Sequence, residues 1–206
     1  MIKENLGNMN IPSHVKLIAV TKTRTVEEIN EAIRAGVNCI GENRVKEAEE
    51  KFNLLLKVEK HMIGSLQTNK VKLAVELFDM IQSVDSLKLA KEIDKRCAAI
   101  HKVMPVLIEV NIGNEKNKHG INPEDVKNFL LELSSLKHIS VQGLMCVAPM
   151  LEPEQVRPYF KKMKQLFDSI GNLKWLSMGM SNDYKIAIEE GSNMVRIGTL
   201  LFGKRE

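Results

Sequence analysis

The chain has 206 residues, of which 44% are hydrophobic and 27% charged; this is typical of a globular protein and too apolar for a disordered one. The net charge is only +4, and the lysines are scattered among acidic residues, so no basic stripe indicates nucleic-acid binding. No apolar run approaches the roughly 18 residues that span a bilayer, and residues 1–14 lack a signal-peptide core. We therefore expect a cytoplasmic protein that contacts no membrane.

Eight short apolar runs alternate with amphipathic stretches along the chain. The runs predict strands at residues 15–20, 38–40, 61–63, 80–84, 106–110, 141–145, 175–178 and 194–197. Between them, apolar residues recur at helical spacing and predict helices at 26–35, 45–56, 69–77, 86–100, 123–133, 153–167 and 184–190. Thr25 is expected to cap the first of these helices, and Asp85 or Ser86 the fourth.

Strands that are apolar throughout are typical of a parallel sheet buried on both faces. Eight strand–helix units favour a single α/β domain over residues 1–206, closed as a (β/α)₈ TIM-type barrel. An open doubly wound sheet is the alternative, but it would need a glycine-rich turn after the first strand, where this chain reads VTKTRT. The cysteines Cys39, Cys97 and Cys146 fall in element patterns and are expected to be free core residues.

In a barrel of this kind, function lies at the C-terminal ends of the strands. Lys22 follows the first strand, where partial desolvation would favour the neutral amine that forms Schiff bases, although a surface lysine is the plainer interpretation. After the seventh and eighth strands, Gly179 with Ser181 and Gly198 with Thr199 offer backbone N–H groups and hydroxyls suited to a phosphate. Together they predict a site for a phosphorylated carbonyl compound, either pyridoxal phosphate or a sugar phosphate.

Other polar residues give weaker signals. His61 is expected to lie at the opposite end of the barrel with a structural role, whereas His119 is a candidate mouth residue or a plain loop residue. Glu42 and Glu109 are too isolated to indicate a catalytic carboxylate pair. No metal site is expected, because the sequence holds no cluster of Cys and His at ligand spacing.

Several segments occur together in the order of a known family. They are LIAVTKTRTVEEINEAIRAG, GENRVKEAEEKF, HMIGSLQTNKVK, SVDSLKLAKEID, VLIEVNIGNEKNKHG, VQGLMCVAPM, LSMGMSNDY and MVRIGTLLFGKRE. In these motifs the chain resembles the pyridoxal phosphate homeostasis proteins (the YggS/PROSC family), which are similar to the N-terminal barrel of alanine racemase. The resemblance extends from about Lys16 to the end of the chain.

The resemblance implies that the cofactor is pyridoxal 5′-phosphate (PLP), held as an aldimine on Lys22. It implies that Arg196 faces the pyridine nitrogen and that Ser181, Gly198 and Thr199 contact the phosphate. It further places Asn43, Ser83 and Met178 around the cofactor. The chain departs from the family where Ser65 replaces a histidine, where Asn182 replaces an aspartate, and in a shorter N-terminal segment, so we expect a truncated leading helix.

Three functions remain open on these grounds. The first is a monomeric, non-catalytic carrier that takes part in PLP homeostasis and delivers PLP to apo-enzymes. The second is a PLP-dependent amino-acid racemase-like enzyme, and the third a Schiff-base sugar-phosphate aldolase. A cation at Arg196 disfavours protonation of the ring, and Tyr159 and Tyr184 are the only tyrosines available to replace a racemase base. The carrier is therefore the favoured hypothesis.

Overall fold

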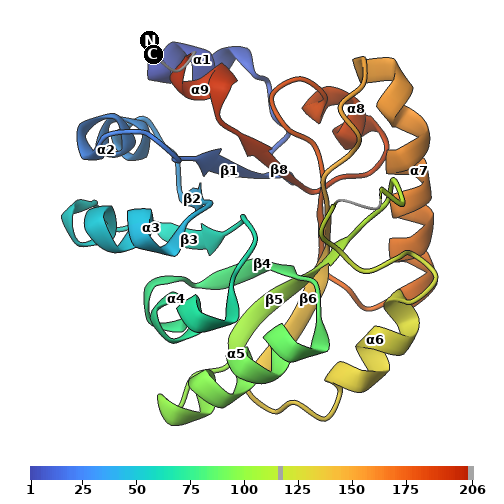
Figure 1. Ribbon diagram of the computed structural model, residues 1–206. Helices are drawn as coiled ribbons and strands as arrows, with labels where there is room; N and C mark the ends of the chain where they lie inside the picture. The colour runs from blue at the N-terminus through green and yellow to red at the C-terminus, as the bar shows by residue number, and fades with distance from the viewer. Residues whose placement is uncertain (116–117, 204–206) are drawn as a thin grey trace.

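A computed structural model describes residues 1–115 and 118–203. Its strands form a closed parallel barrel in chain order, because β8 pairs back with β1 (Figure 1). The predicted (β/α)₈ barrel is confirmed. The strands are β1 Lys16–Val20, β2 Cys39–Glu42, β3 Glu59–Met62, β4 Met80–Val84, β5 Met104–Val110, β6 Ile139–Cys146, β7 Trp175–Ser177 and β8 Met194–Ile197.

Helices surround the barrel and cover the outer face of its strands (Figure 1). In the described part of the chain, none of them has both the length and the apolar character needed to cross a membrane. The helices are α1 Ile2–Asn8, α2 Val26–Arg34, α3 Val45–Lys51, α4 Val71–Leu77, α5 Leu87–Ala99, α6 Val126–Leu133, α7 Pro153–Ile170, α8 Tyr184–Glu189 and α9 Thr199–Phe202, with 3₁₀ turns η1 Phe52–Leu54 and η2 Thr68–Lys70.

The prediction of one helix over 45–56 was wrong at its C-terminal end. Helix α3 stops at Lys51 and continues only as η1, which ends at Leu54. The physical reason lies in the apolar pattern: Phe52 packs edge-on against Phe78, but Leu54 and Leu56 are 64% and 42% exposed. A further helical turn would therefore have had no buried face to stabilise it.

Alternation along the strands divides the apolar residues into two layers. Ala19, Ile40 and Ile81 point outward and belong to the large core between strands and helices. Residues such as Ile18 and Met80 instead fill a smaller cluster inside the barrel, together with Cys39, Leu107, Met145 and Met194. All three cysteines are free and buried, as predicted.

The N-terminal segment forms α1, seven residues long, which packs beside α9 (Figure 1). Asn5 Nδ2 donates a hydrogen bond to the carbonyl of Leu201, and the Tyr184 hydroxyl donates to the carbonyl of Met9. Helix α9 follows β8 directly and was not among the predicted elements, because four residues are too few for a periodic pattern. These contacts hold the start of the chain against the loops that follow β7 and β8.

The start of α2 gives a direct test of the local structure. Thr25 forms a capping box with Glu28, in which each side chain accepts a backbone N–H of the other residue. We predict that Thr25→Ala lowers the free energy of unfolding by about 1 kcal/mol, since a helix N–H loses its acceptor. Urea unfolding of both proteins measures the change. Thr25→Ser keeps the acceptor and is the matched control; equal losses in both variants would contradict the capping explanation.

Candidate active-site cavity

A cavity of about 510 Å³ lies at the C-terminal ends of β1, β6, β7 and β8. The cavity thus lies at the C-terminal rim of the barrel, where this fold predicts a functional site. Its wall contains the predicted site residues Lys22, Ser181, Arg196, Gly198 and Thr199. Residues up to 177 positions apart in the sequence therefore meet around one space, because barrel closure sets the end of β1 beside the end of β8.

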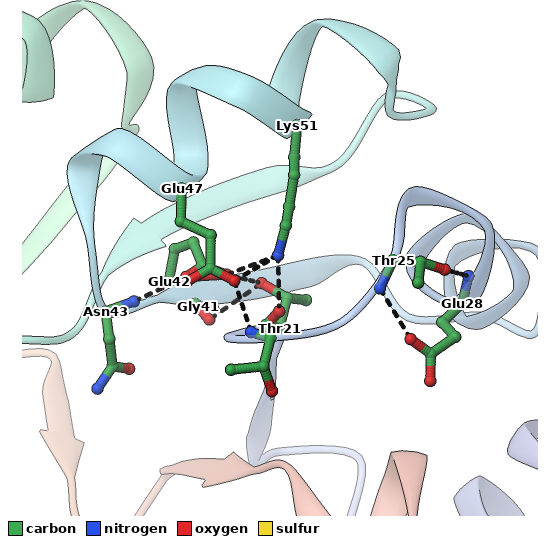
Figure 2. A network of polar contacts seen from close by, with 9 residues as sticks. Thr21, Thr25, Glu28, Gly41, Glu42, Asn43, Glu47 and Lys51 are labelled. Atoms are coloured by element: carbon green, nitrogen blue, oxygen red, sulfur yellow. Dashed lines mark hydrogen bonds and ion pairs between the residues drawn. The ribbon is translucent and has the colours of Figure 1, made fainter. Parts of the chain in front are cut away.

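The other three predicted site residues lie outside this wall. Met178 is fully buried and packs in the core between the sheet and the helices. Ser83 is buried in β4, and its hydroxyl has no hydrogen-bond partner among the described residues. Asn43 follows β2, and its side chain points away from the neighbouring carboxylates (Figure 2). Whether these residues contact a ligand stays a prediction.

Part of the wall was missed by the sequence interpretation. Lys118 lines the cavity, whereas its neighbour His119 is largely exposed and pairs with Asp85. The loop after β6 contributes the apolar residues 147–151, among which Met150 is fully exposed. The signal for this loop was available, because the run VAPMLEP follows the sixth predicted strand just as VTKTRT follows the first.

The charged groups of the wall favour an anion. Lys22, Lys118 and Arg196 carry positive charge, and Asp183 is the acidic residue among the described wall residues. Burial raises the pKa of Asp183, while its Oδ1 accepts the backbone N–H of Met180 at 2.6 Å. The Asp183 carboxylate is thus used to hold the loop after β7. Because Lys118 pairs with Glu115 at 2.6 Å, the cationic character of the wall depends mainly on Lys22 and Arg196. An amine beside a cationic surface suits a phosphorylated aldehyde.

Arg196 is 4% exposed and is held firmly by the barrel. Its Nη1 donates to the carbonyl and the hydroxyl of Ser177, at 3.0 and 2.7 Å, and its Nη2 donates to the carbonyl of Cys146 at 2.8 Å. Burial lowers the pKa of Arg196, but a guanidinium in proteins keeps its charge. The cavity therefore has a fixed cation at its base.

Gly198 fits a wall that a ligand approaches closely. Its φ is −117°, which any residue can adopt, and an added Cβ would meet only Val20, at 3.4 Å. An added Cβ would not clash, so the wall is open at this point, although the ψ of −73° at this φ lies at the edge of the helical region and also favours glycine. Gly179 differs: its φ is +98° and a Cβ would lie 2.6 Å from Ala187, so the turn itself requires glycine.

Comparison with known proteins decides the family. The model of the alanine racemase N-terminal domain matches residues 2–206. The pyridoxal phosphate homeostasis protein of Aquifex aeolicus (strain VF5) is 46% identical over 199 residues, covering 93% of this chain and 87% of that protein. This chain belongs to the pyridoxal phosphate homeostasis protein family. The member from Helicobacter pylori (strain ATCC 700392 / 26695) is 39% identical, with 91% and 87% coverage.

Solved structures agree with this assignment. PipY of Synechococcus elongatus PCC7942, a structure with PLP bound, superposes with a TM-score of 0.90 at 34% identity and covers 98% of this chain and 100% of its own. Alanine racemase of Clostridium difficile 630 has a TM-score of 0.77 at 18% identity. This chain covers 56% of that enzyme, so the likeness shows the shared barrel fold alone.

A polar network fixes the segment around Lys22 in this family member (Figure 2). Glu42 is fully buried at the end of β2, where it accepts hydrogen bonds from the Thr21 hydroxyl at 3.0 Å and the Asn43 N–H at 3.1 Å. Lys51 on α3 lies 3.8 Å from Glu42 and also pairs with Glu47. Lys22 thus follows a residue that is hydrogen-bonded to the neighbouring strand.

Thr23, on the other side of Lys22, is tied to the same network. Its backbone N–H donates to Glu47, and its φ of 64° lies in the left-handed region, which non-glycine residues seldom adopt. Since both neighbours of Lys22 are bound to side chains or backbone of the β2–α3 unit, the lysine leaves the backbone at a defined point of the cavity wall.

The Glu42 carboxyl predicts a pH dependence of stability. Burial, aided by the charge of Glu47, raises the pKa of Glu42 from 4.5 to about 6. The folded state then binds the proton more tightly than the unfolded state, so this group's contribution falls as pH rises from 4.5 to 6 and is level above that. Relative to the Glu42→Gln variant, wild type should lose about 2 kcal/mol over this range.

Urea unfolding at pH 4 and at pH 7.5 measures this difference. The Glu42→Gln protein should gain stability relative to wild type as pH rises, because its amide has no charge to bury. Glu49→Gln, an exposed position on the same helix as Lys51, is the control and should show no such trend. A difference between Glu42→Gln and wild type that does not change with pH would contradict the raised pKa.

Proposed function

We propose that this chain binds PLP through Lys22 and takes part in PLP homeostasis as a carrier of the cofactor. The observation that carries the proposal is the convergence of Lys22, Arg196, Ser181 and Thr199 on one cationic cavity of about 510 Å³. Support comes from relatives named for PLP homeostasis and from the PipY structure with PLP bound.

Different residues of the cavity would hold different parts of the cofactor. PLP supplies an aldehyde that condenses with a lysine amine: the nitrogen adds to the aldehyde carbon, water leaves and a C=N bond forms. Lys22 provides that amine. Ser181 and Thr199 provide hydroxyls from the loops after β7 and β8, and Gly198 leaves the backbone open to the phosphate. Arg196 provides a fixed cation on the side of the cavity that would hold the pyridine ring.

A carrier role follows from what the other side chains do. A permanent cation beside the ring nitrogen opposes its protonation, which weakens the electron sink that amino-acid chemistry needs. Racemisation needs a proton donor on the face opposite the lysine. The hydroxyl of Tyr184 is bound to the carbonyl of Met9 at 3.1 Å, and Tyr159 lies on the outer helix α7; neither belongs to the described cavity wall.

We extend the proposal to delivery of PLP to apo-enzymes by a monomeric, cytoplasmic protein. Val147, Met150 and Leu151 in the loop after β6 expose apolar surface at the rim of the cavity, which suits contact with a recipient enzyme more than sequestered catalysis. Transfer from the loaded protein to an apo-enzyme, followed as recovery of that enzyme's activity, tests this extension.

Covalent trapping tests the Lys22 assignment. Borohydride treatment of the protein incubated with PLP should fix the cofactor on the peptide that contains Lys22, because reduction converts the C=N bond into a stable amine. Lys22→Arg should abolish the adduct while keeping the positive charge. Lys118→Arg, in the same wall, should retain it. An adduct that maps to Lys118 in wild type would overturn the assignment.

Loss of the two hydroxyls tests the phosphate assignment. The double variant Ser181→Ala, Thr199→Val should weaken binding of PLP ten- to a thousand-fold, at about 1.5–3 kcal/mol for each hydrogen bond to a charged group where water fills in only partly. Binding of unphosphorylated pyridoxal should change little. Fluorescence titration with both ligands measures this, and equal weakening of both would contradict a phosphate site at these loops.

A further inference from the structure

A chain of hydrogen-bonded side chains crosses the inside of the barrel and ends at the cavity wall. It starts at β3, where His61 Nε2 lies 2.7 Å from Glu59 Oε1 and His61 Nδ1 lies 2.8 Å from Gln82 Nε2. Across the barrel, the Ser177 hydroxyl donates to Gln82 Oε1 at 2.8 Å. Arg196 Nη1 then donates to that same hydroxyl at 2.7 Å. Four strands, β3, β4, β7 and β8, contribute to the chain.

The groups at the two ends, Arg196 and Glu59, together with a neutral His61 ring, set the direction of every bond in this series of side chains. Arg196 can only donate, so the Ser177 hydroxyl accepts from it and gives its single proton to Gln82 Oε1. The Gln82 amide nitrogen then faces His61 Nδ1, which must accept, and Met194 Sδ at 3.2 Å. The His61 proton therefore sits on Nε2 and is donated to Glu59, a carboxylate that only accepts.

The ionisation of the far end agrees with this direction. Burial lowers the pKa of His61, which keeps its ring neutral. The hydrogen bond from His61, together with the ion pair to Lys16, lowers the pKa of Glu59 to about 2 and keeps it ionised. A neutral histidine with one proton and a charged carboxylate are the states that the bond pattern requires.

We propose that His61, Gln82 and Ser177 are positioning residues that orient the Arg196 guanidinium toward the cofactor ring. The inference rests on the proposed binding of PLP in this cavity. With its proton directed at Gln82, the Ser177 hydroxyl presents lone pairs to Arg196 Nη1, while the carbonyls of Ser177 and Cys146 hold the rest of the group. Removing Gln82 would release the hydroxyl proton and loosen this hold.

The experiment compares Gln82→Met with wild type, and uses Met80→Leu as the matched control. Met80 lies two residues away on β4 and faces the same interior, but it is outside the chain. Ser177→Ala is a second variant, which removes only the hydroxyl. Nitrogen-15 NMR of the ligand-free wild type at pH 7 should show His61 neutral, with its proton on Nε2. In Gln82→Met the Nδ1 resonance should shift, because that nitrogen loses its donor.

The loaded proteins give the second readout. Gln82→Met and Ser177→Ala should bind PLP about ten-fold more weakly, because a guanidinium that is no longer held in place must be ordered when the ligand binds. The ring nitrogen of bound PLP, followed by nitrogen-15 NMR, should take up a proton at higher pH than in wild type, since a loosened cation opposes ring protonation less. Met80→Leu should match wild type in both. A merely structural role would lower stability without moving the titration.

The outcomes separate the inference from the function on which it rests. A protonated His61, or one with its proton on Nδ1, overturns the directed chain in wild type itself. Folded Gln82→Met and Ser177→Ala proteins with wild-type affinity and titration overturn the positioning role alone. A wild-type protein that shows no near-visible absorbance band and no Lys22 adduct overturns both the PLP assignment and the positioning that depends on it.

Discussion

Closure of the barrel between β1 and β8 is the constraint on which the site depends. Four residues of each strand pair in register, from Lys16 opposite Met194 to Ala19 opposite Ile197. This register places the loop after β1 beside the loop after β8. Lys22 and Thr199 become neighbours across one cavity only because the sheet has no free edge there. A slip of one residue would exchange the inward and outward side chains of β8 and move Arg196 out of the barrel.

Polar groups inside the barrel are tolerated because each is matched by a specific partner. A buried carboxylate or guanidinium without such partners would cost several kcal/mol. Arg196 is surrounded by carbonyls and a hydroxyl, and Glu42 by two N–H or O–H donors and a lysine. The raised pKa of Glu42 shows that this compensation is incomplete at the end of β2. Precise placement of the Lys22 segment is thus obtained at some cost in stability.

Most of the fold could be predicted because eight strands buried on both faces occur in the sequence as eight short apolar runs. The strand ends also located Lys22, Ser181, Gly198 and Thr199, since function in a parallel barrel lies at one rim. What could not be predicted depends on contacts between distant segments. Helix α3 ends early because Leu54 and Leu56 are not buried, and the spacing of apolar residues does not show which of them will be buried. The position of Lys118 in the wall depends on a contact with a distant residue, since its Nζ donates to the carbonyl of Ala148 at 3.4 Å.

The interior chain was beyond sequence reasoning for a related reason. Gln82 and Ser177 lie on opposite sides of the barrel, 95 positions apart, and each by itself is an unremarkable polar residue in an apolar strand. His61 was expected to be structural, and its burial agrees with that, but its bonds on both ring nitrogens make it part of the series of side chains that ends at Arg196. Only the closed barrel shows that these side chains reach Arg196.

The contact between α1 and α9 has a mechanical consequence for the two ends of the chain. Asn5 on α1 is bonded to the backbone of Leu201 on α9, and α9 begins at Thr199 in the cavity wall. The contact between α1 and α9 therefore joins the first and last helices outside the barrel, in addition to the pairing of β1 with β8 (Figure 1). Fraying of α1 would break the hydrogen bond from Asn5 to Leu201, so an affinity tag attached to the N-terminus would disturb the cavity wall from the far end of the sequence.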